Sequence, residues 1–312
     1  MLYVFLAIPL ILWYRAAPYQ KRCEGKEEAA MRVIASANQK GGCGKTTTAI
    51  NVSACLASKN QKVLLIDFDP QAHATMGLNL NPAELGKTVY DLVRPKGNGL
   101  AGLEEITIPI SKNFDLVPSN ASLSAAEQEL TGVIGRERKL LNVIESINAP
   151  YDFVVIDCPP SIGHLSFNAL RACNEVIIPI DLSLFSLRGV SKLVEIVIMM
   201  KEKLGHVIVS RALITMFDNR TRYSRYVLEK VKEEFGENVF KTVIRYNIRL
   251  RETVDHGLPI AAYDRHSIGH QDYQLLAEEI VESAEADANQ AYNALKAAES
   301  LLGATRDIPL LE

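Results

Sequence analysis

The residues best suited to chemistry lie in one short segment, residues 38–48, with the sequence NQKGGCGKTTT. Its second half matches the phosphate-loop pattern G-x-x-x-x-G-K-[ST], except that Gln39 stands where the first glycine belongs. Its first half adds a second cation, Lys40, ahead of the expected Lys45. A phosphate loop works with backbone N–H groups and one lysine, so the extra lysine needs its own explanation.

The glycines and hydroxyls of this segment predict a site for a nucleotide and Mg²⁺. Glycine lets backbone N–H groups converge on phosphate oxygens, and the following helix adds favourable dipole charge. We expect Lys45 to reach the β- and γ-phosphates and the Thr46 hydroxyl to coordinate Mg²⁺. Cys43 is expected to be a small filler rather than a redox thiol. The predicted nucleotide-binding set is Gly41, Gly42, Cys43, Gly44, Lys45, Thr46 and Thr47.

Acidic residues at the ends of two apolar runs extend this site. Asp157 ends the run FVVID, and an acid there is expected to hold Mg²⁺, usually through water. Asp67 and Asp69 end another run, and the alternation of side chains along a strand points both the same way. We predict that Asp69 orients the attacking water and belongs to the metal site. The alternative is a pair of capping or solvated acids, because Asp-Pro also opens turns.

Apolar runs that alternate with helical patterns must position these side chains. Strands are predicted over residues 32–37, 62–69, 114–119, 151–160, 175–180, 206–216 and 238–244, and residues 123–147 carry a helical pattern. This alternation indicates an α/β fold, a mostly parallel twisted β-sheet flanked by helices on both faces, as in P-loop NTPases. Ligands of such folds gather at the carboxyl ends of the strands, where the motifs lie.

The bulk composition is that of an ordinary globular protein. The chain has 312 residues, is 48% hydrophobic and 23% charged, and has a formal net charge of −3. It is therefore not polybasic as a whole, and any affinity for DNA must come from a local patch. Five scattered cysteines without a C-x-x-C pair support neither a disulfide scaffold nor a zinc ribbon, so a cytoplasmic location is expected.

The two ends differ from the central domain, which we place at residues 31–281. Residues 2–14 form an apolar run that as a helix reaches only about 20 Å, against roughly 30 Å for a bilayer core. Residues 1–30 are therefore interpreted either as an extension upstream of a natural start at Met31 or as a weak membrane tether. Membrane binding is not expected elsewhere. Residues 282–312 are predicted to form a helix and a loose tail.

At this point several segments resemble a known family. KGGCGKTT resembles the deviant Walker A loop of the ParA/MinD ATPases. VLLIDFDPQAHAT, YDFVVIDCPPSIGHLSFNAL, LITMFDNRTRYSRYVLEKV and VFKTVIRYNIRLRETVDHGLPI resemble partition ATPases of the ParA/Soj type, in order, between about Val33 and Val281. The resemblance implies ATP and Mg²⁺ as cofactors and an ATP-dependent homodimer in which Lys40 crosses to the partner's nucleotide. It also implies catalytic roles for Lys40, Lys45 and Asp69, and a ParB-like or cargo-adaptor protein that stimulates hydrolysis.

The same resemblance implies that the ATP-bound dimer binds DNA without sequence preference and associates with the nucleoid. From Arg211 to Arg251 there are ten Lys/Arg and five Asp/Glu, a local net charge of +5. That asymmetry suits contact with phosphates, although a solvated surface with internal ion pairs is the alternative. Arg220 and Arg249 match the family's DNA-binding arginines best. The arginines that extend the patch are Arg222, Arg225, Arg245 and Arg251.

Three departures from the family pattern leave the cargo open. Arg245-Tyr246 replaces the usual Pro-Arg, residues 179–193 replace a motif with glutamine and glutamate, and Ile268 stands where arginine is common. The cargo is then a chromosome or plasmid or, alternatively, a protein assembly. A MinD-like membrane-associated regulator is disfavoured by the acidic stretch 278–287. A reductase like the nitrogenase iron protein would need a cysteine motif that the sequence lacks.

Overall fold

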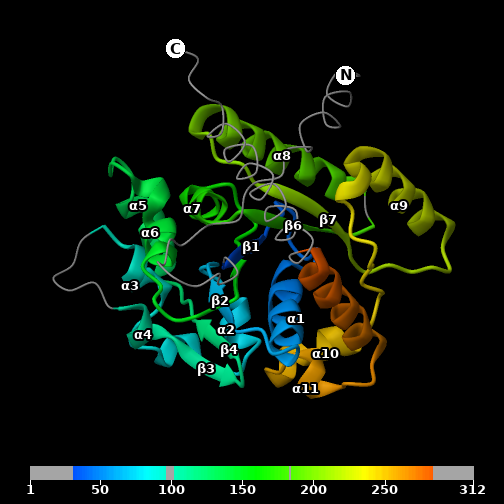
Figure 1. Ribbon diagram of the computed structural model, residues 1–312, viewed down its shortest axis with the longest axis horizontal. Coiled ribbons are helices and arrows are strands. Elements are labelled where there is room, and N and C mark those ends of the chain that lie inside the picture. The colour runs from blue at the N-terminus through cyan, green and yellow to red at the C-terminus, as the bar shows by residue number, and fades with distance from the viewer. Residues whose placement is uncertain (1–30, 96–101, 183, 284–312) are drawn as a thin grey trace, which may run out of the picture.

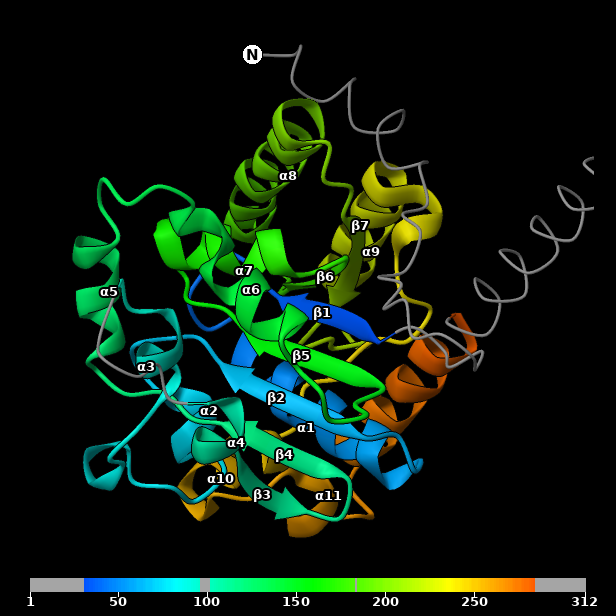
Figure 2. The same ribbon diagram turned by 60° about the vertical axis from the view of Figure 1, so that its left-hand side comes forward.

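One seven-stranded sheet organises the molecule, in the order β3-β4-β2-β5-β1-β6-β7 (Figures 1 and 2). The computed structural model describes residues 31–95, 102–182 and 184–283. All neighbouring strands are parallel except β3, which pairs antiparallel with β4. This confirms the predicted mostly parallel sheet. The strands are β1 (Arg32–Ser36), β2 (Val63–Asp67), β3 (Ile108–Ser111), β4 (Phe114–Val117), β5 (Phe153–Asp157), β6 (Glu175–Ile180) and β7 (Val209–Ile214).

Helices cover both faces of the sheet (Figure 1). One face carries α3 (Val89–Val93), α5 (Leu123–Glu129), α6 (Lys139–Glu145), α7 (His164–Ala172), α8 (Leu184–Leu204) and α9 (Arg222–Phe235). The other carries α1 (Lys45–Ser58), α2 (His73–Met76), α10 (Arg249–His256), α11 (Ile260–Tyr263) and a helical stretch over residues 268–283. The short α4 (Leu103–Ile106) precedes β3, and single 3₁₀ turns lie at Pro82–Glu84, Arg136–Arg138 and Gly236–Asn238.

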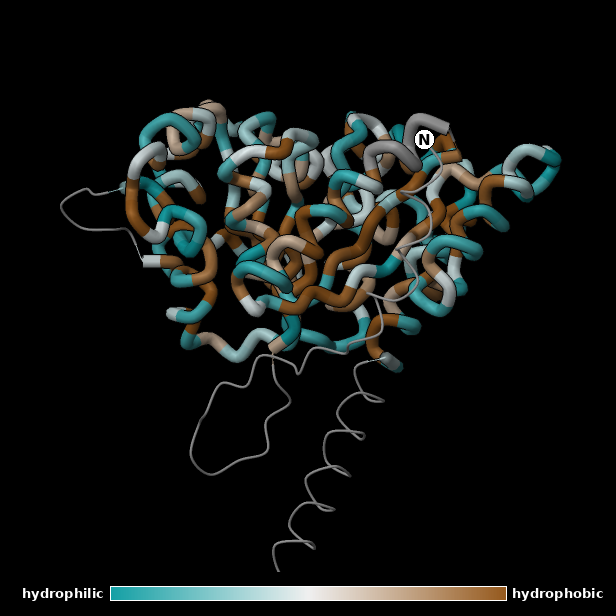
Figure 3. Tube along the Cα trace, turned by 90° about the horizontal axis from the view of Figure 1, so that it is seen from above, coloured by the Kyte–Doolittle hydropathy of each residue, from teal (hydrophilic) through white to brown (hydrophobic). Residues whose placement is uncertain are grey.

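Successive residues of the inner strands point into two separate cores. In β1, Ile34 packs into the core beneath α1, whereas its neighbour Ala35 packs into the core beneath α7 and α8. In β2, Leu65 and Ile66 divide in the same way. Because both faces are covered, the strands are apolar throughout rather than alternating. The hydrophobic segments accordingly run through the middle of the molecule (Figure 3).

The predicted strand over residues 238–244 is wrong. The segment makes only isolated bridges, Ala212 with Val239 and Phe217 with Arg245. The backbone N–H groups of Lys241 and Thr242 instead donate to the Glu279 carboxylate, at 2.9 and 3.1 Å. The N–H groups of Phe240 and Ile244 still donate to carbonyls of β7, at 2.9 and 2.8 Å. The segment therefore meets β7 at separate points, with a side chain of the 268–283 helix between them.

The continuous helical pattern over residues 123–147 is also wrong, and β3 was missed. Gly132 and Gly135 have φ of 80° and 73°, which ends α5 and separates it from α6. β3 has only four residues, of which two are exposed, so no apolar run marks it. Within the described residues no helix is long and apolar enough to cross a membrane, and the predicted tether over 1–30 lies outside them.

Candidate active site

The register of three neighbouring strands brings their last residues into one row. Ser36 of β1 and Asp67 of β2 are both Cα partners of Asp157, the last residue of β5. All three strands are parallel, so these side chains meet at the carboxyl edge of the sheet. The glycine loop starts directly after β1, and it lies at the same edge (Figure 2).

The loop that joins β1 to α1 is held open by glycine and by two hydroxyls. Gly42 and Gly44 have φ of 73° and 94°, a backbone conformation that residues with a side chain rarely adopt. The Ser36 hydroxyl donates to the Lys45 carbonyl at 3.0 Å, and the Thr215 hydroxyl donates to the Cys43 carbonyl at 2.9 Å. These hydroxyls fix the loop's carbonyls on the outside and leave its N–H groups free to converge on an anion.

The two lysines of the loop are in different environments. Lys45 is buried, 7% exposed, and its ammonium donates to the Lys40 carbonyl at 2.8 Å, so it lies across the loop. The Lys40 side chain is 27% exposed and its ammonium contacts the Asp181 carboxylate, just beyond β6. Lys45 is thus placed to serve phosphates in its own loop, whereas Lys40 lies at the rim.

Asp157 is the least satisfied polar group of this edge. It is fully buried, and neither carboxylate oxygen receives a hydrogen bond of normal geometry from the residues that the structure describes. Burial raises its pKa well above the usual range and Asp67 and Asp69 raise it further, while Thr46 and Lys45 lower it. Two unpaired carboxylate oxygens beside a threonine hydroxyl form a donor set that fits Mg²⁺.

The other two acids are held more firmly, and differently from each other. Asp67 accepts hydrogen bonds from the Thr75 N–H and hydroxyl at 2.8 and 2.7 Å, and burial raises its pKa to about 6. Asp69 is 5% exposed and accepts from the Gln71 N–H at 2.9 Å. The alternation of side chains along a strand does not extend to Asp69, because β2 ends at Asp67. Asp67 therefore anchors the turn, and Asp69 lies on that turn, beyond the strand.

Cys43 lies in the loop with its thiol buried. Its Sγ donates to the Lys40 carbonyl at 3.2 Å, and burial raises its pKa despite the nearby Lys45. A reactive thiol needs a lowered pKa, so these features support the filler role. The four cysteines in the described part of the chain are all buried, which disfavours a cluster shared between two subunits.

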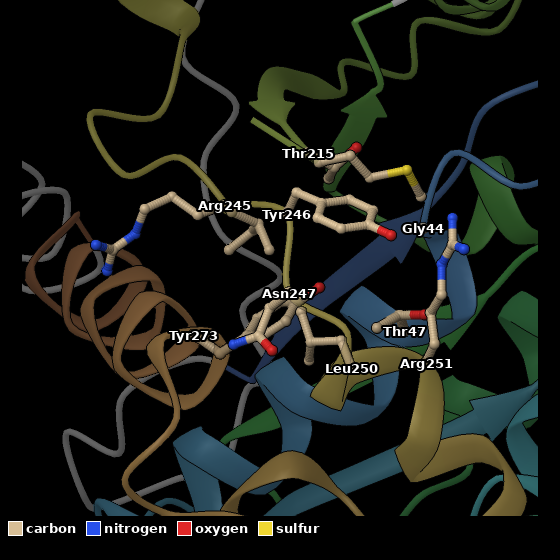
Figure 4. A pocket seen from close by; sticks show the side chains of 11 residues that line it. Gly44, Thr47, Thr215, Arg245, Tyr246, Asn247, Leu250, Arg251 and Tyr273 are labelled. Atoms are coloured by element: carbon tan, nitrogen blue, oxygen red, sulfur yellow. The ribbon is translucent and has the colours of Figure 1, made fainter. Parts of the chain in front are cut away.

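A pocket of about 430 Å³, its open mouth included, lies next to the loop and was not predicted from the sequence (Figure 4). Gly44 and Thr47 line it together with Thr215, Tyr246, Asn247 and Arg251. Gly44 and Thr47 also belong to the predicted phosphate-binding set. A ligand with phosphates in the loop can therefore place an aromatic base here, against Tyr246, a common arrangement for ring ligands.

The predicted DNA-binding arginines do not form one uniform patch. Arg245 points away from the pocket (Figure 4), and its Nε donates to the buried Asp272 carboxylate at 3.0 Å. Arg220 makes a two-pronged ion pair with Asp218, at 2.9 and 2.8 Å. Arg249 pairs with Glu252 at 2.9 Å. The internal ion pairs named as the alternative are therefore present at three of these positions.

The remaining arginines are exposed and lie on two helices. Arg222 and Arg225 are near the start of α9, and neither makes an ion pair or hydrogen bond within the part of the chain that the structure describes. Arg251 on α10 stacks over the Tyr246 ring at 5.4 Å from its centroid. α9 and α10 lie apart in both ribbon views (Figures 1 and 2), so the basic residues divide into two groups.

Known proteins resemble this chain in sequence and in fold. Residues 31–209 match a family model described as an AAA domain. Over 250 residues the chain is 40% identical to the sporulation initiation inhibitor protein Soj of Bacillus subtilis, covering 80% of this chain and 98% of that one. The chain belongs to the Soj/ParA family of ATPases. Accordingly, this Soj/ParA ATPase is an enzyme that hydrolyses ATP.

Two further relatives support the family and the fold of this Soj/ParA ATPase. The chromosome-partitioning ATPase Soj of Treponema pallidum is 40% identical over 251 residues, covering 80% of this chain and 97% of that one. A solved structure of cobyrinic acid a,c-diamide synthase from Mycobacterium smegmatis, with bound ATP analog and magnesium, is 30% identical with a TM-score of 0.70. That match covers 81% of this chain and 95% of the other.

Most residues at the carboxyl edge of the sheet in this Soj/ParA ATPase were predicted from the sequence, but several residues that hold them in place were not. Lys45, Asp69 and Asp157 lie together, as expected. Ser36 and Thr75 were missed because a lone hydroxyl carries no recognisable spacing. Asp181 could have been found, since it follows an apolar strand just as Asp157 ends one.

Proposed function

We propose that this chain uses Mg²⁺ and ATP to switch between a monomer and a DNA-bound dimer, and so partitions a chromosome or plasmid. The observation that carries the proposal is Asp157, a fully buried carboxylate beside the Thr46 hydroxyl that accepts no hydrogen bond of normal geometry from the described residues. Such a group is costly to bury unless a cation completes it. The cargo is proposed from a relative, the chromosome-partitioning ATPase Soj of Treponema pallidum.

The loop and acids divide the work on the nucleotide. Thr46 and Asp157 would hold the cation, and a bound Mg²⁺ would supply neutralisation of the charge on the phosphates. Lys45 contacts the β- and γ-phosphates from its position across the loop, and Asp69 orients the attacking water. The base fills the pocket beside Tyr246.

Lys40 stabilises the dimer, the second state of the proposed monomer–dimer switch. Its ammonium contacts Asp181 in the single chain and lies at the rim of the loop, 27% exposed. In the proposed dimer it leaves Asp181 and binds the partner's nucleotide, so only the γ-phosphate-bound state is held together. Hydrolysis then removes the contact and shifts the population back to monomer.

The dimer binds DNA through arginines at the surface, without sequence preference, and a ParB-like or cargo-adaptor protein stimulates hydrolysis. Phosphate contacts of this kind depend strongly on salt. We therefore propose a cytoplasmic location in association with the nucleoid. An alternative cargo is a protein assembly, favoured by the Arg245-Tyr246 departure, in which Arg245 is occupied by Asp272.

The experiment is size-exclusion chromatography with light scattering, run on the full chain with ADP or with a non-hydrolysable ATP analogue and Mg²⁺. We expect dimer only with the analogue, and monomer in both nucleotides for Lys40→Ala. Lys62→Ala, an exposed lysine at the opposite edge of the sheet, is the matched control and should dimerise normally. A Lys40→Ala protein that dimerises like the wild type would remove the proposed role of that lysine.

Duplex DNA is then added to the same samples in low and moderate salt. Co-elution that requires the ATP analogue and disappears with salt supports the partitioning proposal. DNA that has no effect on elution or hydrolysis contradicts it, and leaves the positioning of a protein assembly as the favoured function.

A further inference from the structure

The first half of α9 carries two arginines and two tyrosines in the sequence RYSRY, residues 222–226. The helix begins at Thr221, whose hydroxyl accepts the Ser224 N–H at 3.1 Å. Val227, Val231 and Phe235 of α9 are buried in the core beneath the sheet. The apolar face of α9 is thus already in use, and its arginines and tyrosines are left facing solvent.

The charges of this helix are arranged unequally along its length. In the second half, Lys230 pairs with Glu233 and Lys232 pairs with Glu229 at 3.2 Å. In the first half, Arg222 and Arg225 have no carboxylate partner among the described residues. The first half therefore presents two uncompensated positive charges, whereas the second half is neutralised within the helix.

Two large rings lie between these charges. Tyr223 is 45% exposed and Tyr226 is 55% exposed, and the two are three positions apart, so they are neighbours on the helix surface. Arg222 and Tyr226 are four positions apart and are also neighbours. Cations alone suffice to hold the phosphates of duplex DNA, whereas exposed rings offer a platform for bases that are not paired.

We propose that this surface of α9, Arg222, Tyr223, Arg225 and Tyr226, binds single-stranded nucleic acid by stacking unpaired bases on the tyrosines. The arginines hold the flanking phosphates, and the helix N-terminus adds favourable dipole charge for them. The inference rests on the proposed nucleic-acid binding and adds a second ligand to it, a strand with exposed bases, beside intact duplex. Tyr246 with Arg251 repeats the ring-and-guanidinium pairing on α10 but belongs to the nucleotide pocket.

The test measures fluorescence anisotropy of labelled oligo(dT) and of a duplex of the same length, with the full chain, ATP and Mg²⁺. Tyr223→Ala/Tyr226→Ala should weaken oligo(dT) binding at least about fivefold and duplex binding less than about twofold. Tyr223→Phe/Tyr226→Phe keeps the rings and should bind oligo(dT) like the wild type. Arg222→Ala/Arg225→Ala should weaken both ligands and reduce the salt dependence.

Lys232→Ala is the matched control, since it removes from the same helix a cation that is already paired with Glu229 at 3.2 Å. Lys230 is kept in the control, because its ammonium lies 5.9 Å from the centroid of the Tyr226 ring. The control substitution should change either affinity less than about twofold. Because all these side chains are exposed, unchanged thermal unfolding is expected and is checked for each variant.

Several outcomes overturn the inference, and each is distinct from failure of the proposed function. If the Phe variant loses as much as the Ala variant, the hydroxyls contact phosphate and stacking is absent. If the wild type binds duplex but not oligo(dT), the inference fails and the DNA-partitioning proposal stands. If it binds oligo(dT) alone, the inference stands and duplex partitioning fails. Binding to neither, or only to anionic lipid vesicles, removes both.

Discussion

Arg32 opens β1 and Asp157 ends the neighbouring β5, so two buried charges lie at opposite edges of one sheet. The Arg32 guanidinium donates to both oxygens of Glu175, at 2.5 and 2.6 Å, and to the Ile280 carbonyl at 2.6 Å. Asp157 accepts no hydrogen bond of normal geometry within the described residues. The buried charge at one edge has its partners within the chain, whereas the buried charge at the other edge can gain partners only from a ligand.

This difference separates stabilising from functional charge without reference to any relative. A buried charge with all its partners contributes to the stability of the folded state. Removing it leaves the partners buried without a hydrogen-bond or ion-pair partner. A buried charge without partners reduces the stability of the empty protein and gains its partner on binding. Substitutions at the two edges should therefore change different measurements.

The largest effect on stability is expected at the edge where Arg32 pairs with Glu175. Arg32→Ala leaves Glu175 unpaired and part-buried, and should lower the free energy of unfolding by about 3–5 kcal/mol. Guanidinium unfolding followed by circular dichroism measures this. Arg138→Ala, whose guanidinium is 46% exposed and lies 3.9 Å from Glu145, should cost less than about 0.5 kcal/mol.

A double substitution sharpens the same point. Replacing both Arg32 and Glu175 by methionine removes the ion pair and leaves neither charge buried without its partner. The double variant should therefore be destabilised much less than Arg32→Ala. A double variant as unstable as the single one would mean that packing, rather than pairing, dominates at this edge.

The largest effect on activity is expected at the open edge. Lys45→Ala removes the ammonium that lies across the loop, and should slow ATP hydrolysis by about 100- to 1,000-fold, as loss of a preorganised charge donor typically does. The free energy of unfolding should change little. Lys59→Ala at the far end of α1, where Lys59 pairs with Glu278 at 2.7 Å, should keep activity within about twofold. Equal losses in both variants would argue against the loop assignment.

Asp157→Asn should have effects of opposite sign on stability and activity. The variant removes a carboxylate whose charged form is disfavoured by burial, so without nucleotide its free energy of unfolding should exceed that of the wild type by up to about 3 kcal/mol, and increasingly so as pH rises. Hydrolysis should be lost, together with the extra protection from heat that Mg²⁺ and ATP give the wild type. Asp152→Asn, an exposed acid beside the first residue of the same strand, is the control for both measurements. A less stable Asp157→Asn protein would show that the carboxylate has a structural role.

The central sheet could be predicted from the sequence, because its strands are buried on both faces and read as apolar runs. The loop and Asp157 followed from spacing, since glycines before a helix and an acid after a strand are local signals. What failed depended on distant partners. Residues 238–244 have a strand-like pattern, but the N–H groups of Lys241 and Thr242 in the middle of it are satisfied by the Glu279 side chain, which is 38 residues from Lys241.

The distribution of charge over the basic residues also depends on distant partners. Charge counting gave a single patch of +5, yet Arg245 pairs with Asp272, 27 residues away, and that contact cannot be read from local sequence. Arg220 is the exception, because Asp218 lies two positions before it. An acid so close to an arginine is a visible warning that its charge is compensated.

The smallest effect on stability is expected at His206, a histidine whose hydrogen-bond partners also lie within the chain. His206 Nε2 lies 3.0 Å from the Leu170 carbonyl and 2.9 Å from the Cys173 carbonyl, so it caps the end of α7 as a neutral donor. Burial lowers its pKa, and the nearby Arg171 lowers it further. The folded state therefore binds fewer protons than the unfolded state, and this contribution to stability is lost as pH falls below about 6.5.

Urea unfolding at pH 7.5 and 5.5 tests this, with His206→Gln as the variant that keeps an N–H donor but cannot titrate. The wild type should lose up to about 1 kcal/mol more than the variant over this range. Asp67, with its pKa raised to about 6, titrates in the same window with the opposite sign and is common to both proteins, so the difference isolates His206. An equal pH dependence in both proteins would place the titrating group elsewhere and leave His206 as a packing residue.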